Sequence, residues 1–482
     1  MTDKTDIHDQ IYLASLPGRK YDVLEKVEIV EAVAEGKSLA RVNDLVIFVS
    51  NAVPGDVADI RIIKKKKKYL EAVPVNFHKY SEHRSEPVCE HFGYCGGCKW
   101  QNLQYSMQLK FKQQQVINDL QRIGKVELPD ILPIIPAAST YFYRNKLDFA
   151  FSNYRWLYPD ELGKEIPPGQ MNALGFHIPG RFDRVIDIRF CHLQPAPSNE
   201  IRLAVKQYAI DNGLTFFDLK RQQGFLRNIV VRSCSNGEIM LIVAFYFEDK
   251  TMREKLLGYI ERKFPEISSI MYVINPKGND TFYDLDVMLY TGKNYITEEM
   301  EGLKFRIGPK SFFQTNSVQA YKLYSVVRDF AGLTGHETVY DLYTGTGTIA
   351  CFIAAVSLKV IGIENVPEAV EDARRNSIIN GINNISFYAG NIETLLNPEF
   401  FEKNGYPDVV ITDPPRTGMH NKVVEALLNA EPGKIVYVSC NPATQARDSA
   451  LLNAKYRITA MQTIDMFPHT HHVENVLVME LS

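Results

Sequence analysis

The sequence predicts an α/β protein whose C-terminal part is a Rossmann-like, doubly wound parallel sheet. Two observations predict this fold. From about residue 310 onward, short apolar strands alternate with helices, which is typical of βαβ units. The expected strands near 338, 359, 408 and 434 are each followed by glycines or by polar and reactive residues. Because ligands bind at the carboxyl ends of parallel strands, we expect a functional site along this edge.

Composition limits the class of protein further. A chain of 482 residues suggests two to four domains. Apolar residues make up 45% and charged residues 23%, the balance of a soluble globular protein. There is no apolar run of membrane-spanning length, and the polar first 20 residues lack an apolar signal core. We therefore expect a cytoplasmic protein with no membrane partner.

Four segments follow one another along the chain. Residues 1–20 form an N-terminal extension, and residues 21–80 predict a small β domain, with alternating stretches at 45–49 and 57–60 split by a Pro-Gly-Asp turn at 54–56. Residues 81–305 predict an α+β central domain, with a helix over 105–123 and β-like runs at 229–231 and 239–247. Residues 306–482 form the domain with the parallel sheet.

The distribution of charge, and not the net charge, indicates a candidate site for nucleic-acid binding. The formal net charge of -3 does not indicate a nucleic-acid binder, but Arg61 and the run from Lys64 to Lys68 are densely basic. Such a run is either a phosphate-binding surface or a solvated turn.

The cysteines indicate a metal or cluster site. An odd count of seven in a cytoplasmic chain argues against a disulfide framework. Cys89, Cys95 and Cys98 lie within ten residues, and Cys191 is a natural fourth ligand. Four thiolates suit either a [4Fe–4S] cluster or a structural zinc, and their spacing leaves both open.

The first turn of the parallel sheet indicates a nucleotide-like cofactor. Gly345 and Gly347 allow close approach of a ligand to the backbone, and Glu364, nineteen residues after Gly345, can accept hydrogen bonds from ribose hydroxyls. The glycine pattern also fits nicotinamide binding. Asp341 before the turn favours S-adenosylmethionine, because a carboxylate opposes a pyrophosphate but tolerates a cationic methionine group.

Cys440 and Glu474 are the candidate nucleophile and base. Cys440 ends an expected strand and is followed by Asn441 and Pro442. Covalent catalysis of methyl transfer needs a thiolate that adds to the substrate ring and a base that then removes a proton. Glu474 stands at the head of the final apolar strand. Cys234 and Cys351 are instead expected to be buried packing residues.

These motifs resemble the RNA uracil-C5 methyltransferase family, in particular its 23S rRNA (RumA-type) branch. The resemblance covers nearly the whole chain and rests on the C-x5-C-x2-C cluster at 89–98, the blocks at 143–146 and 312–316, Asp413-Pro414-Pro415-Arg416, and Ser439-Cys440-Asn441-Pro442. It implies that residues 21–80 form a TRAM domain, a small RNA-binding β-barrel that is OB-like. It also implies S-adenosyl-L-methionine as methyl donor and RNA as substrate. It also favours a [4Fe–4S] cluster held by Cys89, Cys95, Cys98 and Cys191.

The resemblance also implies roles for individual residues. Cys440 would be the nucleophile and Glu474 the base. The residues that would bind the cofactor and line the base pocket are Gln314, Tyr343, Thr348, Glu364, Asn391 and Asp413. Thr348 departs from the family, which often has Asn at this position, and Thr344 stands where many relatives have Cys.

Several alternatives remain open at this point. The substrate could be tRNA instead of 23S rRNA, the methylated group could be an amino group, or the chain could be a non-catalytic RNA-binding protein. We expect a monomer. The expected RNA contacts are the basic run at 64–68 together with Lys110, Lys112, Arg144 and Lys146.

Overall fold

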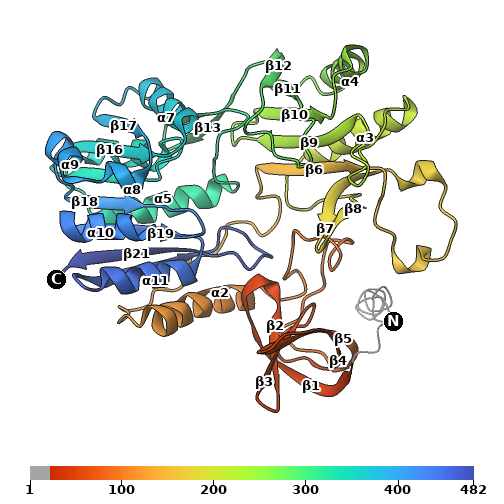
Figure 1. Ribbon diagram of the computed structural model, residues 1–482, viewed down its shortest axis with the longest axis horizontal. Coiled ribbons are helices and arrows are strands. Elements are labelled where there is room, and N and C mark those ends of the chain that lie inside the picture. The colour runs from red at the N-terminus through yellow and green to blue at the C-terminus, as the bar shows by residue number, and fades with distance from the viewer. Residues whose placement is uncertain (1–21) are drawn as a thin grey trace.

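The computed structural model describes residues 22–482, so the expected extension at 1–20 lies outside the described residues. The described chain forms a small barrel and two large sheets, which follow one another along the sequence (Figure 1). No helix within 22–482 is long and apolar enough to cross a membrane.

The N-terminal β-barrel is confirmed. Its strands close in the order β1-β2-β3-β5-β4. Alternate residues such as Ile29, Ile47 and Ile60 point into the barrel and are fully buried, as period-2 patterning requires. The strand bounds are β1 (Val23–Ala32), β2 (Ser38–Val42), β3 (Leu45–Val49), β4 (Val57–Lys65) and β5 (Tyr69–Lys79).

The central sheet has the order β12-β11-β10-β9-β6-β7-β8 and is antiparallel except where β10 pairs with β11. Helices α3 (Ser198–Asp211) and α4 (Lys250–Lys263) pack on it through Ile201, Val205 and Leu257. The strand bounds are β6 (Lys146–Ser152), β7 (Ala173–Ile178), β8 (Arg181–Asp187), β9 (Leu226–Ser233), β10 (Ile239–Phe245), β11 (Ser269–Ile274) and β12 (Val287–Gly292). A separate hairpin, β13 (Ile296–Met300) and β14 (Leu303–Ile307), follows.

The C-terminal sheet has the order β17-β16-β15-β18-β19-β21-β20. Its first five members are parallel; four of them, β15, β16, β18 and β19, were predicted, whereas β17 was not. Strand β21 is antiparallel to both neighbours because it returns from β20 through a hairpin. The start of β21 therefore lies at the edge where the parallel strands end. The bounds are β15 (Thr338–Leu342), β16 (Lys359–Glu364), β17 (Ile385–Ala389), β18 (Val409–Thr412), β19 (Lys434–Ser439), β20 (Tyr456–Ile464) and β21 (Glu474–Leu481).

Helices cover both faces of this sheet. One face carries α5 (Ser317–Ala331), α6 (Thr348–Ile353) and α7 (Pro367–Ile379), packed on residues such as Val339 and Val360. The other face carries α10 (Asn421–Ala430) and α11 (Pro442–Leu452), packed on Tyr340 and Ile361. Two short helices, α8 (Ile392–Leu395) and α9 (Pro398–Asn404), lie between β17 and β18 in the chain.

Helix α2 (Tyr105–Asp119) comes early in the chain but packs on the C-terminal sheet. Its Val116, together with the following Leu120, joins the hydrophobic core formed by Tyr340, Tyr437 and Ala446. Figure 1 shows α2 beside α11, far from the central sheet that follows it in sequence. The helix ends in a π-helical turn at Leu120–Gly124. The segment after the cysteines therefore connects the N-terminal half to the C-terminal domain.

Candidate active site

The turn after β15 has backbone angles that are typical of a tight turn, in which a ligand can approach the backbone closely. Tyr343, Gly345 and Gly347 all have positive φ angles, of 63°, 56° and 74°. A Cβ atom on Gly347 would lie 2.9 Å from both Ala373 Cβ and Phe387 Cζ. Only glycine therefore satisfies both the backbone angle and the packing at 347.

Glu364, at the end of β16, is held against this turn. Its carboxylate accepts hydrogen bonds from the Gly345 N–H (3.0 Å) and the Val366 N–H (3.0 Å), one on each oxygen. A carboxylate offers about four acceptor positions, so each oxygen can still accept a ligand hydroxyl. The structure thus places Glu364 where the sequence analysis expected a ribose-binding residue.

Asp341 is a buried carboxyl group beside the same turn. Its Oδ2 accepts hydrogen bonds from the Thr344 hydroxyl and from the Ala350 N–H (3.1 Å). Its Oδ1 is buried and has no hydrogen-bond partner among the described residues. Burial raises the pKa of Asp341 to about 7. A cationic ligand would stabilise the ionised form of this group.

Asp413 and Glu474 are brought together with Asp341 around one buried tyrosine. Burial raises the pKa of Asp413 to about 7. Burial, and then the charge of Asp413, raises the pKa of Glu474 well above its usual value. The pKa of Tyr324 on α5 is raised by its own burial and by the charges of Asp413, Asp341 and Glu474. Three carboxyl groups, in β15, directly after β18 and at the start of β21, therefore converge at one edge of the sheet.

Cys440 lies at the same edge, directly after β19, and is partly accessible. Burial raises the pKa of its thiol to about 11, with smaller contributions from the charges of Glu474 and Asp413. Arg416 opposes this increase, because its side chain lies within charge and hydrogen-bonding reach of the thiol and lowers the pKa. Asn441 caps α11 and donates a hydrogen bond to the Arg416 carbonyl at 2.8 Å, which joins the two loops.

The remaining residues expected to bind a cofactor have different settings. Gln314 is buried just before α5, and its backbone carbonyl accepts a hydrogen bond from the Asn145 amide at 2.9 Å. Thr348 is buried at the start of α6, and its hydroxyl lies 3.2 Å from that of Thr346. Asn391 is exposed and caps α8, and it shares a separate cavity of about 360 Å³ with Tyr343.

The four cysteines expected to form a cluster gather at one place. Cys89, Cys95, Cys98 and Cys191 all line a single cavity of about 130 Å³, with Phe92, Leu147 and Ile188 among the other lining residues. Asn199 fixes the backbone of Cys191 through two hydrogen bonds, of 2.8 and 3.0 Å. No group of three or more His, Cys, Asp or Glu side chains in the described part of the chain is arranged so that it could hold a metal ion.

The basic residues differ in their surroundings. The run Lys64–Lys68 is exposed at the β4–β5 hairpin, although Lys64 pairs with Glu71 (3.2 Å) and Lys65 with Asp22 (2.8 Å). Lys110 is exposed, and Lys146 pairs with Asp148 (3.3 Å). The prediction that Lys112 contacts RNA is wrong: the side chain is completely buried in an ion pair with Asp465.

Sequence reasoning missed two features of the site. Arg416 was noted only for its place in the Asp-Pro-Pro block, although a charged residue just after a strand end was a usable signal. The Lys112–Asp465 pair joins residues more than 350 positions apart, and nothing in the local pattern of either residue indicates the other.

Comparisons with known proteins agree with this geometry. A model of the tRNA (uracil-5-)-methyltransferase family matches residues 287–481, and a model of the TRAM domain matches residues 15–75. An uncharacterised RNA methyltransferase of Bacteroides thetaiotaomicron is 58% identical over 93% of this chain and 99% of its own. A second, from Porphyromonas gingivalis, is 53% identical over 94% of this chain and 99% of its own.

A solved structure extends the similarity to the whole fold. The Pyrococcus abyssi tRNA (uracil-54, C5)-methyltransferase, in complex with S-adenosyl-L-homocysteine, is 28% identical to this chain. The match covers 94% of this chain and 100% of the other, with a TM-score of 0.72. On the sequence matches and this shared fold, the chain is an enzyme that belongs to the RNA uracil-C5 methyltransferase family and carries an N-terminal TRAM domain.

Proposed function

We propose that this enzyme transfers a methyl group from S-adenosyl-L-methionine to carbon 5 of a specific uridine in RNA, through a covalent bond between Cys440 and carbon 6. The observation that carries the proposal is the convergence of Cys440, Asp413 and Glu474 at the carboxyl edge of the C-terminal sheet. A nucleophile, a base and a buried acidic pocket for a cationic donor are what this reaction needs.

The proposed reaction has three steps in this site. The Cys440 thiolate adds to carbon 6, and the displaced electron pair makes carbon 5 nucleophilic. Carbon 5 then takes the methyl group from the sulfonium of the donor, and S-adenosylhomocysteine is left. Glu474 accepts the C5 proton, the C–H electron pair restores the C5–C6 double bond, and the bond to sulfur breaks. Arg416 supports the first step by lowering the pKa of the thiol.

The donor would be held at the turn after β15. We propose that Glu364 accepts the ribose hydroxyls, since its oxygens receive the Gly345 and Val366 amides and retain acceptor capacity. Asp341, with one buried oxygen unpartnered among residues 22–482, suits the cationic methionine group. Gln314, Tyr343, Thr348, Asn391 and Asp413 complete the proposed set of residues that bind the cofactor and line the base pocket.

We propose a [4Fe–4S] cluster at Cys89, Cys95, Cys98 and Cys191. The four cysteines line one cavity, so a single group could bind all four thiolates. Four thiolates suit either a structural zinc or an iron–sulfur cluster, and the family resemblance favours the cluster. Methyl transfer through a thiol adduct moves no net electrons, so the cluster would have a structural role. Anaerobically purified protein should contain about four iron atoms per chain, and colourless protein with one zinc ion would refute the assignment.

We propose 23S rRNA as the substrate, on the resemblance of the cysteine cluster and the neighbouring motifs to that branch of the family. tRNA is the second candidate, because the Pyrococcus abyssi neighbour acts on tRNA uracil-54. Mapping of 5-methyluridine in rRNA and tRNA, from cells with and without the gene, tests both. Loss of one methyluridine from 23S rRNA supports the first candidate, loss from tRNA supports the second, and no loss from either contradicts the proposed function.

We propose that the enzyme acts as a monomer in the cytoplasm. One chain already supplies Cys440, Asp413 and Glu474, so the site needs no residue from a second copy. We also propose domain boundaries near residues 80 and 305. The first lies between the barrel and the central sheet, and the second falls in the β13–β14 hairpin, between the central and C-terminal sheets.

A further inference from the structure

The loop between β20 and β21 determines where the proposed base stands. In the β20–β21 ladder Ile464 lies directly opposite Glu474. The loop of residues 465–473 therefore connects Ile464 to Glu474, the proposed base. A shift of this loop would therefore move the Glu474 carboxylate relative to the pyrimidine ring.

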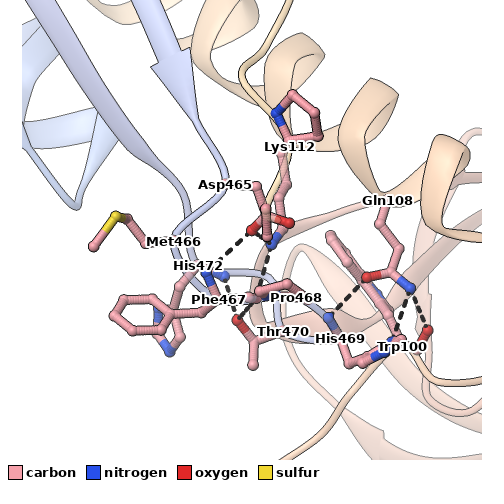
Figure 2. Close-up of polar contacts among 12 residues, drawn as sticks. Trp100, Gln108, Lys112, Asp465, Met466, Phe467, Pro468, His469, Thr470 and His472 are labelled. Carbon is pink, nitrogen blue, oxygen red and sulfur yellow. Dashed lines mark hydrogen bonds and ion pairs between the residues drawn. The ribbon is translucent and has the colours of Figure 1, made fainter. Parts of the chain in front are cut away.

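One contact holds the start of this loop to α2. The Nζ atom of Lys112 lies 2.6 Å from Asp465 Oδ1 and donates to the Phe467 carbonyl at 3.0 Å (Figure 2). The Tyr105 hydroxyl donates to Asp465 Oδ2 at 2.8 Å. Neither member of the ion pair is exposed to solvent. Such a pair is stable when further hydrogen bonds satisfy both groups, as they do here.

A second contact holds the middle of the loop, one helical turn earlier on α2. Gln108 Oε1 accepts a hydrogen bond from the His469 N–H at 2.8 Å, while its Nε2 donates to the Trp100 and Leu103 carbonyls (Figure 2). The His469 carbonyl in turn accepts the Lys99 N–H (2.7 Å) and the Trp100 N–H (3.0 Å). Residues four apart share one face of a helix, so Gln108 and Lys112 both contact the loop from the same face of α2.

From these contacts we infer that Gln108 and Lys112 are positioning residues for Glu474 in the proton-removal step. The inference rests on the proposed function. Both side chains are completely buried, so they act through Asp465 and His469 and not on the RNA itself. Addition of the thiolate and methyl transfer both precede proton removal and do not use Glu474 as a base. A displaced loop should therefore slow proton removal and cleavage of the bond to sulfur most. The methylated Cys440–RNA adduct should then accumulate.

The test uses full-length enzyme, unmodified substrate RNA and excess methyl donor. Gln108→Ala removes the hydrogen bond to His469 and leaves no charge. The double variant Lys112→Met with Asp465→Asn removes the ion pair and leaves no unpaired buried ion. Gln114→Ala, an exposed glutamine on the same helix, is the matched control. We expect kcat to fall about tenfold to hundredfold in the first two, as for small misplacements of a catalytic group. The KM for RNA should change little, and the covalent adduct should accumulate on denaturing gels.

The outcomes separate this inference from the proposed function. If both variants turn over at the wild-type rate, or slow down without accumulating adduct, the loop contacts do not position the base and the inference is wrong. Gln108→Ala keeps the test decisive if the double variant does not fold. Glu474→Gln is the reference: if it forms no adduct while the wild type methylates RNA, the proposed function fails instead.

Discussion

Arg416 lies within reach of the Cys440 thiol, and the two residues come from different strand ends. Arg416 follows β18 and Cys440 follows β19, and these strands are parallel neighbours in the sheet. The arginine is the group that lowers the pKa of a thiol that burial raises to about 11. We therefore expect the proposed nucleophile to depend on the adjacent loop for part of its ionisation.

Replacement of Arg416 should slow adduct formation. In Arg416→Ala the pKa of Cys440 should rise further, so less thiolate is present at neutral pH and kcat should fall about tenfold or more. Raising the pH should restore part of the rate, since it restores the thiolate. The rate of alkylation of Cys440 against pH, in wild type and variant, measures the shift directly. Superimposable alkylation profiles would show that Arg416 does not tune the thiol.

Methyl-donor binding should depend on pH through Asp341 and Asp413. Their pKa values are raised to about 7, so both are neutral in acid and ionise as the pH rises through 7. A sulfonium cation binds the ionised carboxylates better, so affinity should rise from pH 6 to pH 8, with protons released on binding. The increase is at most about tenfold per pH unit for each group.

Calorimetric titrations in buffers of different ionisation enthalpy count the released protons. S-adenosylhomocysteine, which lacks the sulfonium charge, is the matched ligand and should show a weaker pH dependence. Equal pH dependence for the two ligands would contradict a role for these carboxyl groups in recognising the sulfonium.

The glycine at position 347 should be essential to the cofactor turn. Gly347→Ala places a Cβ against Ala373 and Phe387, so we expect a loss of about 1–3 kcal/mol in the free energy of unfolding and weaker S-adenosylhomocysteine binding. Gly345→Ala is the control, because its Cβ would meet nothing within 4 Å and only the positive φ is unfavourable. Denaturant unfolding and ligand titration check both variants; equal effects would argue against close packing at 347.

Loss of the proposed cluster should loosen the loop before Glu474. Lys99 and Trp100, which follow Cys98 directly, hold the His469 carbonyl. Chelation of the iron, or Cys98→Ser, should therefore increase amide hydrogen exchange in the loop of residues 465–473. Peptides of β16, remote from the cysteines, provide the internal reference. Unchanged exchange in the loop after complete iron removal would show that the two sites are not coupled.

The parts that could be predicted from the sequence are those with a local pattern. Alternating apolar residues predict the barrel strands, and the apolar runs near 338, 359, 408 and 434 predict four of the five parallel strands, with their polar or reactive ends. The antiparallel direction of β21 was not predicted, because an apolar strand carries no sign of its direction. The burial of Lys112 was missed for a similar reason, since only its distant partner Asp465 explains it. Glu474 was found because a carboxylate at a strand head has a local signature.

The central claim is a transient bond between Cys440 and the pyrimidine ring, and trapping that bond tests it most directly. RNA containing 5-fluorouridine should form a stable adduct, because fluorine cannot leave as a proton does. Mass spectrometry of the digested complex should locate the methylated fluoropyrimidine on Cys440, and Cys440→Ser should form no adduct and no 5-methyluridine. Methylation by Cys440→Ser at the wild-type rate, or an adduct on another residue, would contradict the mechanism.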